Sequence, residues 1–102
     1  MRKRRFGKAS VDVTFKPIDR QTLDAHRVFK DEHDWYPTVR ELGVALGLHS
    51  YSPAKYRLDR LVSLGLLHRD PGNARSIRLT EEGLLVAVGD QFGVTIIPQE
   101  EA

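Results

Sequence analysis

Residues 38–80, TVRELGVALGLHSYSPAKYRLDRLVSLGLLHRDPGNARSIRLT, contain the clearest secondary-structure signals in the chain. Two short segments with apolar residues at helical spacing come first, and a glycine-containing turn joins them. Two strand-like segments around a Pro-Gly-Asn turn follow. Helix, turn, helix and β-hairpin is the order of parts in a winged helix-turn-helix. The sequence therefore predicts an α+β fold with a three-helix core and a β-hairpin wing, and this fold implies DNA binding.

The first of these two helices has a well-marked beginning and end. Thr38 and Glu41 have the T-x-x-E spacing of a capping box. Gly47 follows the last helical residues, where a left-handed conformation is easily adopted. Gly43 lies inside the helix at a cost of roughly 1 kcal/mol relative to alanine, which predicts that another backbone packs closely there. The residues predicted to face inward are Val39, Leu42 and Leu46.

The next helix is the predicted DNA-reading element. It begins at Ser50 or Ser52, because either hydroxyl can cap a helix. A recognition helix presents its N-terminal residues to base edges in the major groove, and Ser52, Lys55 and Tyr56 occupy those turns. An ordinary solvated helix face would also be polar, so polarity alone does not separate the two interpretations. The position of these residues in the motif favours the DNA-reading one. The residues predicted to be buried on the other side are Ala54, Leu58 and Leu61.

The hairpin after Gly65 is the predicted wing. Residues 71–73 supply the turn, and Arg69 and Arg75 flank its tip. Arginines beside a recognition helix can enter a minor groove or bind phosphates, although a soluble charged turn would look similar. Alternation places Ile77 and Leu79 on one face of the hairpin and Ser76 and Arg78 on the other.

Charge is distributed unevenly along the chain. Residues 38–80 carry seven cations and three acids, whereas residues 81–102 carry five acids and no Lys or Arg. The first eight residues carry five cations, which predicts a basic flexible arm that either contacts DNA or is simply solvated. Cations gathered in two patches attract the phosphates of DNA, and acids elsewhere oppose unspecific wrapping of DNA around the protein.

Composition excludes several classes of protein. The chain has no cysteine, and its four histidines show no metal-ligand spacing, so we expect no disulfide, no metal and no cofactor. No nucleophile-base set or phosphate loop is present, so we expect no enzyme activity. No apolar run reaches the roughly 20 residues that span a bilayer, and we expect a soluble, cytoplasmic protein that associates with the nucleoid when bound to DNA.

Before residue 38, the sequence predicts a strand and a helix. Val11 to Phe15 alternate apolar and polar side chains up to Pro17. A helix from an Asp19 N-cap to about His33 follows, and Trp35 is expected to pack in the core or at its rim. The residues predicted to face the core from this helix are Ala25, Val28 and Phe29.

After the wing, Thr80 can cap a fourth helix with acids in its first turn. Gly83 and two valines make a strand the alternative for this segment. A strand near 94–97 is the natural partner of residues 11–15, within one chain or between two. Residues 84–97 are apolar enough for a homodimer interface, and completing the core of a monomer is the equal alternative.

Three segments together carry a family resemblance: PTVRELGVALGLHS, then L-x-x-L-x-x-x-G-x-L from Leu58 to Leu67, then RDPGNARSIRL. They resemble the amino-terminal DNA-binding domain of LexA-type repressors. The resemblance implies a three-helix winged fold, and it places residues that read the major groove at Ser50, Ser52, Lys55 and Tyr56. The side chains at 55 and 56 differ from those expected in the best-known members, so no operator sequence is carried over. LexA-type repressors also have a self-cleaving domain with a serine and lysine pair, which we expect this chain to lack.

The main expectation is a sequence-specific regulator of transcription that binds double-stranded DNA. The resemblance implies that it is a repressor. No small-molecule ligand is inferred. A winged-helix protein-interaction module within a larger assembly is the alternative. The predicted organisation is a basic arm at 1–10, one winged-helix domain at 11–98 and an acidic tail at 99–102. The predicted base-reading residues are Ser50, Ser52, Lys55 and Tyr56; the predicted backbone or wing contacts are Thr38, Arg40, Arg60, Arg69, Asn73, Arg75 and Arg78; and the arm contributes Arg2, Lys3, Arg4 and Arg5.

Overall fold

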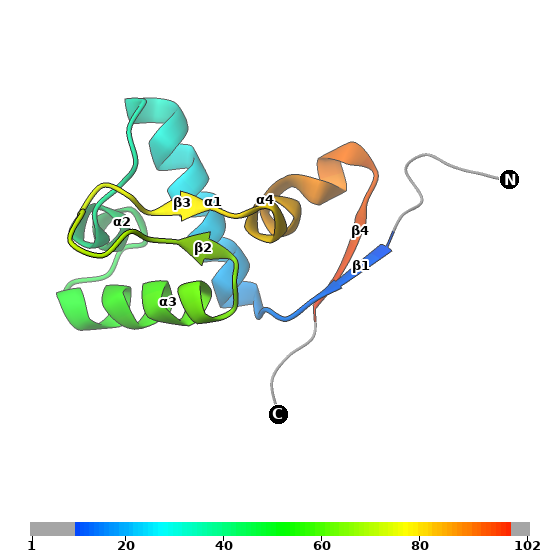
Figure 1. Cartoon of the computed structure of the whole chain (residues 1–102), viewed down its shortest axis with the longest axis horizontal. Coiled ribbons are helices and arrows are strands. Elements are labelled where there is room, and N and C mark those ends of the chain that lie inside the picture. Colours follow the sequence, from blue (N-terminus) through cyan, green and yellow to red (C-terminus); the bar gives the residue numbers. More distant parts are fainter. Residues whose placement is uncertain (1–9, 99–102) are drawn as a thin grey trace, which may run out of the picture.

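The computed structural model describes residues 10–98 (Figure 1). Three helices and the β-hairpin form one part of the molecule, and the two terminal strands lie beside each other at its other end (Figure 1). The predicted winged helix-turn-helix is thus confirmed. The elements in chain order are β1 (Ser10–Val13), α1 (Pro17–His33), α2 (Val39–Ala45), α3 (Tyr51–Ser63), β2 (Leu67–His68), β3 (Arg78–Leu79), α4 (Glu81–Val88), a 3-10 helix η1 (Gly89–Phe92) and β4 (Thr95–Pro98).

The start of α1 differs from the prediction. Lys16 is the N-cap and Pro17 the first helical residue, a position where proline's missing N–H costs nothing. Asp19 is therefore the third helical residue, and its Oδ2 accepts a hydrogen bond from the Lys16 N–H at 2.7 Å. The prediction of Asp19 as N-cap was wrong, because its carboxylate caps the helix from inside.

The buried face of α1 is also not the predicted one. Val28 is 43% exposed, and Ala25 and Phe29 are only half-buried. The helix instead buries Leu23 together with polar residues that find partners inside the protein. The Thr22 hydroxyl donates to the carbonyl of Ile18 at 2.9 Å. The buried residues of α1 are Asp19, Thr22, Leu23 and His26.

The contact between α2 and α3 follows the sequence signals. Thr38 Oγ1 accepts from the Glu41 N–H at 3.1 Å and the Glu41 carboxylate accepts from the Thr38 N–H at 2.9 Å, which confirms the capping box. A Cβ on Gly43 would lie 3.0 Å from the Cβ of Ala54 in α3, so the two helices need glycine for their close approach. Gly47 has a φ of +75° and turns the chain toward α3.

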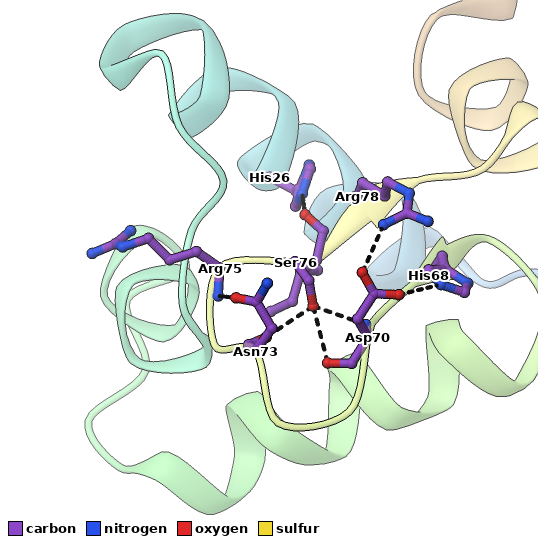
Figure 2. A network of polar contacts seen from close by, with 8 residues as sticks. His26, His68, Asp70, Asn73, Arg75, Ser76 and Arg78 are labelled. Atoms are coloured by element: carbon purple, nitrogen blue, oxygen red, sulfur yellow. Dashed lines mark hydrogen bonds and ion pairs between the residues drawn. The ribbon is translucent and has the colours of Figure 1, made fainter.

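The wing is a short antiparallel pair with a long tip. Leu67 pairs with Leu79 and His68 with Arg78. Ile77 is buried, and Ser76 is buried too, at 4% exposure, although alternation predicts them on opposite faces of the hairpin. Its hydroxyl donates to main-chain oxygens of the tip and accepts from the Asp70 N–H at 2.8 Å. The tip therefore closes around Ser76 (Figure 2).

The segment after the wing is a helix, which decides between the two predictions for it. Thr80 Oγ1 accepts from the Gly83 N–H at 3.0 Å and caps α4 as expected. A Cβ on Gly83 would lie 1.9 Å from the carbonyl oxygen of Leu66, so α4 packs directly on the backbone that enters the wing. Gly83 allows this close packing, although it weakens the local helix signal.

The terminal strands pair within the chain. β1 and β4 are parallel, with Val11 opposite Ile96. This pairing is one of the two arrangements predicted for residues 11–15. Trp35 is 50% exposed and lies at the rim, with its ring centroid 5.5 Å from that of His33. No helix within residues 10–98 is long and apolar enough to cross a membrane.

Candidate nucleic-acid interface

The exposed side of α3 carries three of the four predicted base-reading residues. Ser52, Lys55 and Tyr56 are all exposed, and Tyr56 is 69% exposed. The opposite side of the helix is completely inaccessible to solvent, which fixes its rotation. The buried residues that fix it are Ala54, Leu58 and Leu61, as predicted.

Lys55 is already paired on this surface. Its Nζ lies 2.6 Å from Oδ2 of Asp59, one turn further along α3. Both side chains are about half exposed, so this pair contributes little to folding stability. Any other anionic or carbonyl partner of Lys55 would have to replace Asp59.

The turn before α3 supplies the fourth residue. Ser50 is the N-cap of α3, but its hydroxyl makes no capping hydrogen bond. It lines a shallow hollow of about 130 Å³ between α2 and α3, together with Arg40, His49 and Tyr51. The Arg40 guanidinium lies 5.5 Å from the centre of the Tyr51 ring. Sequence reasoning missed His49 and Tyr51, which only the fold brings beside Arg40.

Arg75 lies at the wing but is held by the protein. Its guanidinium forms two hydrogen bonds with Glu41, at 2.8 and 3.1 Å, and a third with the carbonyl of Tyr36 at 3.0 Å. The guanidinium also lies 5.9 Å from the centre of the Trp35 ring. The hydrogen bonds from Arg75 and from the Thr38 amide lower the pKa of Glu41 to about 2. This arrangement makes Arg75 part of the scaffold that positions the wing.

Other polar residues of the wing hold its shape (Figure 2). Asn73 Oδ1 accepts from the Arg75 N–H at 3.0 Å. Asp70 lies between His68, at 3.0 Å, and Arg78, at 3.4 Å, and the hydrogen bond from His68 lowers its pKa. Arg69 is half-buried near the tip.

Arg60 is largely enclosed by the protein and does not belong to the exposed face of α3. Its side chain is 14% exposed, and its Nε lies 3.0 Å from Oδ1 of the buried Asp19. The Thr38 side chain is likewise engaged, in the capping box. The predicted contacts from Arg2, Lys3, Arg4 and Arg5 lie outside the described residues. Among residues 10–98, no group of three or more His, Asp or Glu side chains could hold a metal ion.

Comparison with known proteins agrees with this geometry. Residues 19–76 match the LexA DNA binding domain family. The LexA repressor of Oenococcus oeni is 49% identical over 55 residues, which cover 54% of this chain and 26% of that protein. The LexA repressor of Limosilactobacillus reuteri is 37% identical over 70 residues, which cover 69% of this chain and 31% of that protein.

A longer match covers more of the chain. The LexA repressor of Bacillus licheniformis is 35% identical over 85 residues, which cover 78% of this chain and 41% of that protein. The chain thus spans between about a quarter and two fifths of the length of these relatives. The family match covers more than half of the chain and includes α1, α2, α3 and the wing tip. This chain belongs to the LexA DNA binding domain family.

Proposed function

We propose that this protein is a sequence-specific transcriptional repressor that reads double-stranded DNA with α3. The observation that carries the proposal is the complete burial of one side of α3, which leaves Ser52, Lys55 and Tyr56 projecting together into solvent. An α-helix presented in this way fits the major groove, where the four base pairs are distinguishable. Such a repressor acts at the chromosome, in the cytoplasm.

The residues around α3 support the same orientation. Ser50 and Arg40 lie at its N-terminal end, where phosphates flank a helix inserted in the groove. Asn73, Arg69 and Arg78 belong to the wing, which would follow the adjacent backbone. Thr38, Arg60 and Arg75 are engaged within the protein, and we propose that they act by holding α2, α3 and the wing in register.

Selection of bound duplexes from a random DNA library tests this proposal. We expect enrichment of one short motif at physiological salt, with affinity that falls steeply as salt rises because phosphate contacts release counterions. Recovery of no motif, with salt-independent capture of DNA, would contradict sequence-specific reading. The control protein is a variant with Ser52, Lys55 and Tyr56 all replaced by alanine, which should bind weakly and without enrichment.

We also propose that the protein forms a homodimer through α4 and η1. Leu84 and Phe92 are 48% and 74% exposed, and they border an apolar hollow of about 400 Å³ that Leu85 and Val88 also line. Exposed apolar surface of this kind marks an interaction site. The same patch is what favours the second candidate function, a protein-interaction module.

Sedimentation analysis distinguishes the two roles of this patch. A dimer that Leu84→Ser with Phe92→Ser converts to a monomer supports self-association. Val28→Ser, which changes an exposed valine on α1 outside this patch, should leave the mass unchanged. A wild-type protein that stays monomeric at all concentrations would overturn the homodimer.

A further inference from the structure

A second hollow lies between α1 and β3, away from the predicted base-reading residues. Its volume is about 240 Å³. Liquid water occupies about 30 Å³ per molecule, so the space suits a small ligand of several heavy atoms. The residues that line it are His26, Arg27, Lys30, Asp31, Tyr36, Arg78 and Leu79.

The floor of this hollow contains a buried histidine with one unused nitrogen. His26 is 1% exposed, and its Nε2 lies 2.7 Å from the carbonyl oxygen of Ile77. A carbonyl can only accept, so Nε2 carries the hydrogen and Nδ1 of the neutral ring has a lone pair. Burial lowers the pKa of His26, which keeps the ring neutral at pH 7. Nδ1 is buried and finds no hydrogen-bond partner among the described residues.

A neighbouring donor is unsatisfied as well. The Nε of Arg27 is buried and has no hydrogen-bond partner among residues 10–98. A buried polar atom without a partner costs about 1–3 kcal/mol, so native proteins seldom keep two in one place without an occupant. An occupant that satisfies both atoms must donate a hydrogen to Nδ1 of His26 and accept one from Nε of Arg27.

The lining of the hollow holds more cations than acids, although Asp24, Asp34 and Asp70 pair with these cations from outside the lining. Arg27, Lys30 and Arg78 face one acid in the lining, Asp31. The ion pairs of these three cations are long, between 3.4 and 4.0 Å. By contrast, the pairs of Arg20, Lys55 and Arg75 with their carboxylates measure 2.6 to 2.8 Å. The cations at the hollow are therefore weakly engaged and can turn toward an anion.

Tyr36 closes one side of the hollow. Its ring stacks with His26 at a centroid distance of 5.9 Å, and the Nζ of Lys30 lies 5.5 Å from the centre of the same ring. The site is thus built from α1, the segment after it and β3. Figure 2 shows His26 beside the wing and Arg78 on β3, with the Arg78 guanidinium directed toward Asp70.

We propose that this hollow binds a small oxyanion that carries a hydroxyl group, such as hydrogen phosphate or dihydrogen phosphate. The hydroxyl donates to Nδ1 of His26, and the anionic oxygens accept from Arg27, Lys30 and Arg78. A phosphodiester of DNA has no hydroxyl on phosphorus and meets only the second requirement. The ligand would bridge α1 and β3, and because β3 is a strand of the wing, it would help to hold the wing against α1.

Titration with inorganic phosphate tests this site in the intact chain, with the imidazole NMR signals of His26 as the readout. We expect saturable shifts with phosphate and much weaker ones with sulfate at equal ionic strength, because sulfate at neutral pH has no hydrogen to donate. Arg27→Gln and Arg78→Gln should each weaken phosphate binding about tenfold, the loss of one charge-assisted hydrogen bond. Arg20→Gln, which removes a cation of α1 outside the hollow, is the matched control and should bind as the wild type does.

Three results would overturn the proposal. The first is an absence of saturable shifts at His26 with phosphate. The second is equal binding of sulfate, which would remove the hydroxyl requirement. The third is unweakened phosphate binding by Arg27→Gln and Arg78→Gln, which would place the bound anion outside this hollow.

Discussion

Glu41 and Arg75, which are 34 positions apart in the chain, form a two-point ion pair that fastens the wing to the start of α2. The distances between their nitrogens and oxygens are 2.8 and 3.1 Å. The same carboxylate accepts from the Thr38 N–H at 2.9 Å. One side chain therefore both begins a helix and fixes the hairpin beside it.

The first prediction concerns this pair. Arg75→Gln should weaken binding of all DNA sequences about equally, because the wing loses its support while the base-reading surface is unchanged. In a double-mutant cycle of unfolding free energies with Glu41→Gln, we expect a coupling of about 0.2–1 kcal/mol, since the pair is partly exposed. A change in preference at one particular base after Arg75→Gln would instead show direct reading by Arg75.

The second prediction concerns the exposed face of α3. Lys55→Ala or Tyr56→Ala should change sequence preference by roughly 1–3 kcal/mol at the base pairs that each side chain contacts. Competition binding with single-base variants of the selected motif measures this change. Ser63→Ala is the control, because Ser63 lies at the far end of the helix and its hydroxyl donates to the Arg60 carbonyl. Unaltered DNA binding by both test variants would mean that α3 is not the recognition helix.

The third prediction concerns Gly83. Gly83→Ala should lower the free energy of unfolding by roughly 1–3 kcal/mol or more, because its Cβ meets backbone atoms of Leu66 that cannot rotate away. Urea denaturation provides the measurement. Glu82→Ala, at the neighbouring exposed position, should cost at most about 1 kcal/mol through the helix dipole. Equal losses for the two variants would contradict the close packing of α4 on Leu66.

The fourth prediction concerns pH. Burial lowers the pKa of His26 below its ordinary 6.5, so the unfolded chain takes up this proton first. Stability should therefore be complete above pH 6.5 and fall as pH drops below that value. Glu41, with its pKa held at about 2 against an ordinary 4.5, contributes stability above pH 4.5 that is lost between about 4.5 and 2.

Urea denaturation at a series of pH values separates these two windows. Glu41→Gln should remove part of the decline below pH 4.5 and leave the decline just below pH 6.5 intact. Stability that rises on acidification from pH 7 to 5.5 would exclude a buried neutral His26.

Local signals predicted much of the central region. The capping box at Thr38 and the cap at Thr80 operate within three residues, so sequence spacing alone specifies them. The burial of Ala54, Leu58 and Leu61 follows from helical periodicity. The exposure of Ser52, Lys55 and Tyr56, the proposed base-reading residues, is predictable for the same reason, because they occupy the side that periodicity leaves exposed.

The same reasoning did not predict the burial of polar residues whose partners are far away in the sequence. Asp19 is predicted as an N-cap and His26 has no predicted partner, yet both are buried. Asp19 pairs with Arg60, 41 positions away, and His26 bonds the carbonyl of Ile77, 51 positions away. Arg60 satisfies the Asp19 carboxylate and Ile77 satisfies Nε2 of His26, and the identity of these partners is a property of the folded chain.

The sequence by itself determined the helix-turn-helix, the wing and the exposed face of α3, because caps, glycine turns and apolar periodicity act over a few residues. Tertiary structure alone decided which face of α1 is buried, the pairing of β1 with β4 and the attachment of Arg75 to Glu41. These features depend on contacts between segments 34 to 85 positions apart, whose geometry exists only once the core has formed.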